Sequence, residues 1–294
     1  MKKFRPVLLS FDWAFFYLIL VRAFIGLRLE HFLLTGLIVG CYCFAGRTRH
    51  FVEDFIPFAL FGALYDFLRI FPKEWAGAIH VVGPYLLEQK LFGYSCAVGR
   101  CIPTDFFKNV QHPVLTVVTS LAYSLHMVVP LILAFCLWVK DRRLTQQFAW
   151  AFFLANLFAF ATYLFFPAAP PWYVEIYGLK AADWSIPPNA AGLLRFDQII
   201  HFPYFAGVYA KSAWVFGAIP SMHAGFPVLE ILFAHKIFKK GVWPFYLFML
   251  TVWFAAVYLR HHYVIDLLSG ALYVLAAYFL VTLITRRKLH AVSS

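Results

Sequence analysis

The fold is decided by the stretch LRHHYVIDLLSGALYVLAAYFLVTLIT, which runs from residue 259 to residue 285. From residue 262 onward this run is long enough for a membrane-spanning helix, which takes about 20 predominantly apolar residues. The run nevertheless contains an aspartate, Asp266. A carboxylate inside an apolar helix is costly and is a functional-site hypothesis by default. The stretch therefore predicts a spanning helix with a chemical function near its beginning.

The rest of the 294-residue chain has the composition of a membrane protein. It is 63% apolar, 20% aromatic and only 13% charged, whereas a soluble domain is about 45–50% apolar and about 25% charged. This composition excludes a soluble globular protein, a disordered chain and a disulfide-dense secreted domain. We expect an all-α, polytopic bundle of about eight apolar helical segments, and residues 1–294 form a single integral membrane domain. The expected segments are about 8–27 (which can also lie in the interface), 30–46, 51–71, 113–139, 145–166, 217–237, 243–260 and 262–285.

The positive charges predict the orientation of these segments. Excess Lys and Arg marks cytoplasmic loops, and five basic groups fall on alternate connections if the spans number eight. Both termini are then cytoplasmic, and the long connections 72–112 and 168–216 face the other side. The net charge of +11 is thus explained without nucleic-acid binding. The groups are Lys2, Lys3 and Arg5; Arg47 and Arg49; Lys140, Arg142 and Arg143; Lys236, Lys239 and Lys240; Arg286, Arg287 and Lys288.

A second informative stretch, FGAIPSMHAGFP, occupies residues 216–227. Pro220 suits the first turn of a helix, and Ser221 can cap it. A helix N-terminus presents free N–H groups and partial positive charge, which suits a phosphate. His223 would lie in the first turn, at the outer membrane face. Taken alone, the pattern also fits an ordinary capped helix with one interfacial histidine.

His262 and Asp266 are four residues apart, so they share one face of a helix and can hydrogen-bond. His261 lacks a carboxylate at this spacing. A carboxylate fixes the tautomer of an imidazole and makes it a better nucleophile. A structural pair that holds two helices together is the alternative. Because one helix, a basic turn and a returning helix separate His223 from His262, the topology predicts that the three side chains meet at one membrane depth.

The pattern PS-x-H followed by H-x-x-x-D resembles the type 2 phosphatidic acid phosphatase superfamily. The arginine that this superfamily usually carries six residues before the second histidine is replaced by Ala256, and the basic K-x6-R-P element is absent in that form. Together with FPAAPPWY, in the stretch 166–173, the motifs resemble the inositol phosphorylceramide synthase branch, the targets of aureobasidin A. The resemblance covers roughly residues 110–285 and implies a six-helix core, with residues about 113–285 as its catalytic part.

The resemblance implies a role for each residue of the triad. His262 would attack the phosphorus of a phospholipid and form a phosphohistidine, and Asp266 would orient His262. His223 would protonate the leaving lipid alkoxide and then serve as base for the incoming alcohol. The implied partners are a phospholipid donor and a lipid-alcohol acceptor such as a ceramide. No cofactor and no metal ion are implied, and the sequence has no metal-ligand cluster with recognisable spacing.

Several further residues are candidates for substrate binding. Ser221 lies at the expected phosphate cradle, and Lys211 and Arg260 are candidate cations for the phosphate. Asp66 and Arg69, three apart near the outer end of a segment, either recognise a headgroup or neutralise each other. Each of these cations also fits an ordinary loop charge at the headgroup level.

His126 and Asn156 are polar positions within spans, where we expect interhelical hydrogen bonds. Cys96 and Cys101 share the loop CAVGRC on the expected outer side, where a small disulfide is a hypothesis.

Three functions remain open at this point. The first is a lipid phosphotransferase that moves a phospho-headgroup such as phosphoinositol to a ceramide-like alcohol. The second is a lipid phosphate phosphatase that uses the same triad with water as acceptor. The third is a transporter or scramblase, which does not explain the convergence of two histidines and an aspartate. The active site is expected on the non-cytoplasmic face of a bacterial inner membrane or a Golgi-type membrane, and the oligomeric state is left open.

Overall fold

The apolar segments predicted from the sequence all form helices in the computed structural model, which describes residues 5–44, 46–97 and 99–293. Lys2 and Lys3 of the first basic group lie outside the described residues. The helices are α1 (Arg5–Phe24), α2 (Leu29–Phe44), α3 (Arg47–Phe67), α6 (Pro113–Ser124), α7 (Val128–Lys140), α8 (Arg142–Phe165), α12 (Met222–Ile237), α13 (Trp243–Tyr258) and α14 (Val264–Ser293).

Four of the described segments are long and apolar enough to cross a membrane. They are Pro6–Phe24, Pro113–Lys140, Arg142–Phe165 and Val264–Arg286, and Leu29–Phe44 and Trp243–Tyr258 are shorter apolar helices. Large apolar side chains are exposed along α1, α7, α13 and α14. A monomeric soluble protein rarely exposes so wide an apolar surface to water, whereas a membrane protein places such a surface in contact with lipid. The fold is therefore an all-α, multi-pass membrane bundle.

Two expected segments differ in detail from the structure. Segment 113–139 is not one continuous helix, because a 3₁₀ turn at Leu125–Met127 separates α6 from α7. Pro130 lies in the first turn of α7, and its missing N–H makes an uninterrupted helix unfavourable there. In segment 217–237 the helix begins only at Met222, so Pro220 precedes it, joined to Ile219 by a cis peptide bond, instead of lying in the first turn.

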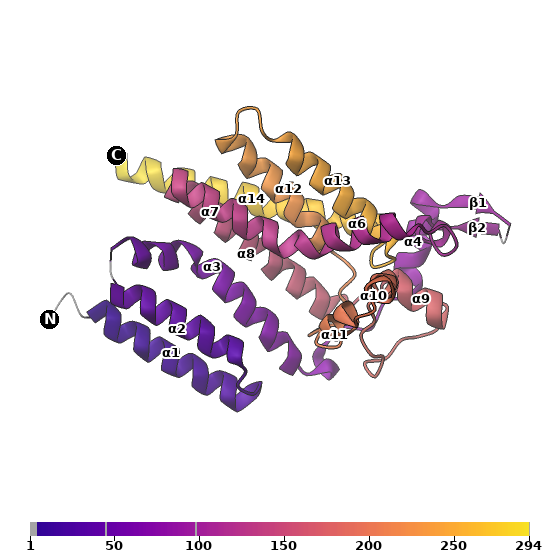
Figure 1. Ribbon diagram of the computed structural model, residues 1–294, viewed down its shortest axis with the longest axis horizontal. Coiled ribbons are helices and arrows are strands. Elements are labelled where there is room, and N and C mark those ends of the chain that lie inside the picture. The colour runs from indigo at the N-terminus through magenta and orange to yellow at the C-terminus, as the bar shows by residue number, and fades with distance from the viewer. Residues whose placement is uncertain (1–4, 45, 98, 294) are drawn as a thin grey trace.

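The two long connections fold into short elements that gather at one end of the bundle, away from the start of α1 and the end of α14 (Figure 1). They form α4 (Val82–Phe92), β1 (Tyr94–Cys96), β2 (Gly99–Cys101), α5 (Pro103–Phe106), α9 (Pro171–Tyr177), α10 (Leu194–Ile200) and α11 (Tyr204–Tyr209), with 3₁₀ turns at Lys73–Trp75 and Ala191–Leu193; a further 3₁₀ turn, Leu68–Ile70, ends the segment of α3. The strands pair antiparallel, with Tyr94 opposite Cys101. Elsewhere in the bundle, Lys140 donates to the carbonyl of Ile237, which brings two of the basic connections together.

Small residues allow the central helices to approach closely. In membranes, helices associate mainly through packing, and small side chains at the interface permit it. A Cβ at Gly270 of α14 would lie 2.0 Å from the carbonyl oxygen of Ser221, so the start of α12 can lie against α14 only because residue 270 is glycine. The fully buried alanines of α8 serve the same purpose; they are Ala149, Ala151, Ala155 and Ala159.

Candidate active site

The beginnings of α12 and α14 meet at the end of the bundle that carries the long connections. The backbone N–H of Ser221 donates to the carbonyl oxygen of Asp266 at 2.9 Å, which links the two helix starts directly. His223 lies in the first turn of α12, as predicted. His262 precedes α14 by two residues instead of starting it. Its backbone N–H and that of His261 both donate to the carbonyl of Ala256, so the turn closes on the end of α13.

Hydrogen bonds fix the tautomer of His262. Its Nδ1 lies 3.0 Å from the carbonyl oxygen of Ala218 and 3.3 Å from Oδ2 of Asp266, so this nitrogen carries the proton and donates. The fully buried Asp266 also accepts from the N–H of Tyr263 at 2.8 Å. The Nε2 of His262 therefore keeps its lone pair, and it faces Nδ1 of His223 at 3.4 Å. The predicted convergence of the three side chains is present.

Aromatic rings hold His223 in this position. The ring of Tyr123 stacks on one side, with 4.2 Å between centroids, and the ring of His126 lies at 3.9 Å. Among the described residues, neither His126 nor Asn156 forms the interhelical hydrogen bond that we expected. His126 bonds instead to the carbonyl of Tyr123, and Asn156 to that of Phe152 in its own helix. His126 thus forms part of the wall of the site, which its spacing in the sequence did not indicate.

His261 has a structural position. Its ring lies between those of Tyr123 and Tyr209, and its Nε2 donates to the carbonyl of Ala190 at 3.0 Å. Burial, and then the neighbouring imidazole of His262, lower the pKa of His261 to about 3. The ring is therefore neutral, and it fastens the segment before α10 to the turn that carries His262.

The hydroxyl of Ser221 does not cap α12. Ser221 occupies the N-cap position, but its side chain forms no capping hydrogen bond. The residue is fully buried, and its Oγ has no partner within the described part of the chain. The reason is the close approach of α14, which holds the backbone of Ser221 against Asp266 and Gly270. The hydroxyl is thus buried at the N-terminus of α12 with its hydrogen-bonding capacity unused among the described residues.

Glu88 holds the first turn of α14, a role that the sequence did not reveal. Its fully buried carboxylate accepts the N–H groups of Val264 at 3.0 Å and Ile265 at 3.1 Å. It thereby satisfies two of the N–H groups that a helix N-terminus leaves free. Burial raises the pKa of Glu88 to about 7, against the lowering effect of these two bonds. Because Asp266 belongs to the same turn, Glu88 holds the backbone that carries it.

Two arginines lie beside the turn. Arg260 is 8% exposed, and its backbone has a positive φ of 61°. Its carbonyl accepts from the N–H of Trp172 in α9, and its Nε lies 3.2 Å from Oε2 of Glu175. Burial, and then the charge of Arg260, lower the pKa of Arg195 in α10. The Nη1 of Arg195 is buried with no partner in the described residues. Arg195 is a cation that we did not single out from the sequence.

The other predicted binding residues lie apart from the triad's hydrogen bonds. Asp66 and Arg69 pair at 2.8 Å, as their spacing predicted. Asp66 also accepts from Arg28 at 2.5 Å and lies 3.0 Å from Nε2 of His31. This cluster joins the turn before α2 to the end of α3. Lys211 is exposed after α11. A role in substrate binding for these residues stays a prediction.

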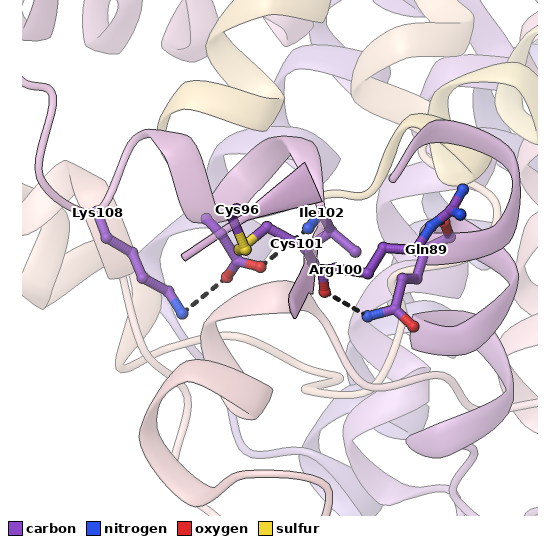
Figure 2. Close-up of a disulfide and its surroundings, with 7 residues drawn as sticks. Gln89, Cys96, Arg100, Cys101, Ile102 and Lys108 are labelled. Atoms are coloured by element: carbon purple, nitrogen blue, oxygen red, sulfur yellow. Dashed lines mark hydrogen bonds and ion pairs between the residues drawn. A yellow bond between two sulfur atoms is a disulfide. The ribbon is translucent and has the colours of Figure 1, made fainter. Parts of the chain in front are cut away.

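The disulfide hypothesis is confirmed. Cys96 and Cys101 are bonded across the β1–β2 hairpin, which leads directly into α5 (Figure 2).

Comparisons with known proteins show which family the chain belongs to. A family model described as the PAP2 superfamily matches residues 105–280. The chain is 38% identical to a phosphoinositol dihydroceramide synthase of Bacteroides thetaiotaomicron over 86% of this chain and 84% of that protein. It is 30% identical to an inositol phosphorylceramide synthase of Candida albicans over 89% of this chain, and 30% identical to an inositol phosphorylceramide synthase catalytic subunit of Schizosaccharomyces pombe over 76% of this chain. It spans only 55% and 52% of these two fungal proteins. No solved structure matches significantly.

The matched region, residues 105–280, contains α6–α8 and α12–α13, the beginning of α14, and all three members of the triad. The relatives are named as synthases of phosphoinositol-bearing ceramides, a similar yeast protein is named an inositolphosphotransferase, and the similarity to the bacterial synthase extends over most of both proteins. This chain is therefore an integral membrane transferase that belongs to the PAP2 superfamily.

Proposed function

We propose that the protein transfers phosphoinositol from phosphatidylinositol to the hydroxyl of a ceramide or dihydroceramide and releases diacylglycerol. The observation that carries the proposal is the line of contacts from Asp266 through His262 to His223, in a chain that is 38% identical to a phosphoinositol dihydroceramide synthase. The catalytic residues are then His262, Asp266 and His223.

The first half-reaction forms a bond between Nε2 of His262 and phosphorus. The lone pair of Nε2 is available because Nδ1 carries the proton, and Asp266 stabilises the positive charge that develops on the ring. The bond from phosphorus to the diacylglycerol oxygen breaks, and His223 donates a proton to that oxygen. Reacting atoms approach to about 3–3.5 Å before bond formation. In this structure Nε2 of His262 and Nδ1 of His223 are 3.4 Å apart, so a phosphorus atom has no room between them. Donor binding therefore has to separate the two imidazoles.

The second half-reaction regenerates the enzyme. His223 takes the proton of the lipid hydroxyl, the oxygen attacks phosphorus, and the bond to His262 breaks. The N-terminus of α12 and the hydroxyl of Ser221 support the phosphoryl oxygens, because helix N–H groups and preorganised donors stabilise developing negative charge. The chemistry requires no metal ion. Short elements of both long connections cover this end of the bundle, and the exclusion of water favours transfer over hydrolysis.

The proposal is tested with purified enzyme, labelled phosphatidylinositol and lipid mass spectrometry, with and without ceramide. We expect a labelled inositol phosphorylceramide and diacylglycerol, with little headgroup release when ceramide is absent. Release of phosphate or inositol phosphate into water at a rate that ceramide does not change would select the phosphatase alternative. Full transfer activity in a folded His262→Ala variant would refute the mechanism. Cysteine labelling of residues 140–143 from the cytoplasmic side tests the orientation.

A further inference from the structure

A lipid acceptor has to reach the triad from the membrane, and the burial of the side chains indicates the side on which the triad is accessible. His262 and Asp266 are buried, whereas His223 keeps an exposed part. His126 is also only partly buried, and the centroid of its ring lies 3.9 Å from that of His223. A molecule that approaches the triad on this side therefore meets these two imidazoles before it meets His262.

His126 lies in a break of a membrane-spanning segment. The span Pro113–Lys140 is interrupted by the 3₁₀ turn Leu125–Met127, and the neighbouring Leu125 and Val128 are 43% and 45% exposed. Apolar side chains that are exposed within a span contact lipid, so this turn belongs to the lipid-facing surface. Short 3₁₀ stretches inside longer helices often occur at functional positions. The break thus places a polar ring between the lipid and the acid–base histidine.

One hydrogen bond determines which nitrogen of His126 is available. Nδ1 lies 2.8 Å from the carbonyl oxygen of Tyr123, which can only accept, so Nδ1 carries the proton and donates. The ring is neutral, since an unpaired charge inside a span is costly. In a neutral imidazole the second nitrogen is an acceptor, and Nε2 of His126 has no hydrogen-bond partner among the described residues. The site therefore holds an unused acceptor beside His223.

An acceptor at this place distinguishes the two lipid alcohols of the proposed reaction. The attacking hydroxyl belongs to a ceramide, and the leaving oxygen belongs to diacylglycerol. On the next two carbon atoms a ceramide carries two further donors, an amide N–H and a second hydroxyl, whereas diacylglycerol carries only ester oxygens, which accept. When the reacting hydroxyl of a ceramide contacts His223, one of these donors comes within reach of the adjacent ring of His126, whose centroid is 3.9 Å away.

We propose that Nε2 of His126 accepts a hydrogen bond from the amide N–H or the second hydroxyl of the ceramide, and thereby selects a sphingolipid alcohol over diacylglycerol. This inference rests on the proposed function and deepens it, because His223 acts on the reacting hydroxyl and His126 recognises the group next to it. Diacylglycerol leaves the acceptor unpaired, and a site built around a hydrogen bond discriminates against a ligand that cannot form it.

The test compares the wild type with purified His126→Phe, which keeps an aromatic ring but has no acceptor. The kcat/KM for ceramide should fall about three- to tenfold, the usual effect of one hydrogen bond between neutral groups. The kcat/KM for diacylglycerol as acceptor, measured by transfer of labelled phosphoinositol, should stay within about twofold. The wild type should lose a similar factor with a ceramide that lacks its second hydroxyl or carries an N-methyl amide, and His126→Phe should not lose it again with that same analogue.

Two more variants complete the comparison. His126→Gln has a side-chain oxygen that accepts, so it should restore part of the preference for ceramide. His235→Phe is the same change at an exposed position near the other end of α12, and it should leave the preference unchanged. A purely structural role of the His126 ring would lower the rates with both alcohols equally. That result, or a wild-type preference in folded His126→Phe, would overturn the assignment.

A binding measurement separates this inference from the proposed function. Thermophoresis in detergent, with fluorescent short-chain ceramide and diacylglycerol, needs no turnover. The Kd for ceramide should be about three- to tenfold higher for His126→Phe than for the wild type, and the Kd for diacylglycerol should be the same for both. If the wild type transfers no phosphoinositol but shows this difference, the function fails and the assignment of His126 stands. If transfer proceeds but both proteins bind ceramide equally, the assignment fails.

Discussion

Glu88 offers the sharpest test of how the bundle holds its triad. The carboxylate accepts two N–H groups of α14, from Val264 and Ile265, inside a fully buried environment. Glu88→Ala leaves both groups without an acceptor, and each such group costs about 1–3 kcal/mol. The free energy of unfolding should therefore fall by about 2–6 kcal/mol. Glu88→Gln keeps one acceptor oxygen, so its loss should be about half as large.

These losses convert into measurable melting shifts. At about 2 °C per kcal/mol for a chain of this size, Glu88→Ala should lower the Tm by about 4–12 °C and Glu88→Gln by about 2–6 °C. Scanning fluorimetry in detergent measures both, with Glu74→Gln as the exposed control. A displacement of a catalytic group by about 1 Å can lower the rate about 10²-fold. We therefore expect the kcat of Glu88→Ala to be lower than that of the wild type by about this factor when both are assayed well below the Tm of the variant, where it is folded. A Glu88→Ala enzyme with wild-type Tm and kcat would refute the capping role.

Three further predictions follow from the site. Asp266→Asn should lower kcat about 10²–10⁴-fold without loss of fold, measured with a fluorescent short-chain ceramide, and unchanged kcat would contradict its orienting role. The pKa of Glu88 rises from 4.5 to about 7 on folding, so the stability that this shift contributes is full below pH 4.5 and is lost as the pH rises through 7. The Tm difference between wild type and Glu88→Gln, which does not titrate, should therefore narrow between pH 4.5 and pH 7. A Tm difference that stays constant over this range would contradict the pKa shift. Replacement of Cys96 and Cys101 by serine should cost about 2 kcal/mol, seen as a lower Tm that reductant reproduces in wild type, and equal Tm values would argue against the bond.

The parts of this molecule that depend on local patterns could be predicted from the sequence. Apolar runs indicated the helices, and the four-residue spacing of His262 and Asp266 indicated their contact. The meeting with His223 followed from the alternation of spans. The exact start of α14 did not follow, because the N–H groups before Asp266 are satisfied by its own carboxylate and by Glu88.

The residues that the sequence did not reveal act across long separations. Glu88 contacts positions 176 and 177 residues further along the chain, and no local spacing signals such a pair. The same holds for Asp66, whose pairing with Arg69 could be predicted but whose contact with Arg28, 38 residues away, could not. For Ser221 the local pattern led to a wrong prediction. The pattern is that of an N-cap, but the close packing of Gly270 against the backbone of Ser221 leaves its side chain without a capping hydrogen bond.

The replacement of the usual arginine by Ala256 has a structural counterpart. Ala256 is fully buried in an apolar cluster that includes Tyr123 and Tyr258, so a guanidinium there would lie among aromatic rings. The cation nearest His262 in sequence is instead Arg260, which lies on the same turn.

The position of the cation, at residue 260 instead of residue 256, suits the charge of the proposed substrate. A terminal phosphate ester carries up to two negative charges on three free oxygens, whereas the phosphodiester of a phospholipid carries one charge on two. A site for the diester needs fewer cations around phosphorus, and it gains more from groups that hold the headgroup attached to the third oxygen. Near His262 the described residues place Arg260, whose Nε lies 3.2 Å from Oε2 of Glu175, and the neighbouring Arg195. Because Glu175 offsets part of this positive charge, the site suits the single charge of a phosphodiester better than a doubly charged terminal phosphate, which favours transfer of the headgroup together with the phosphorus over the release of phosphate.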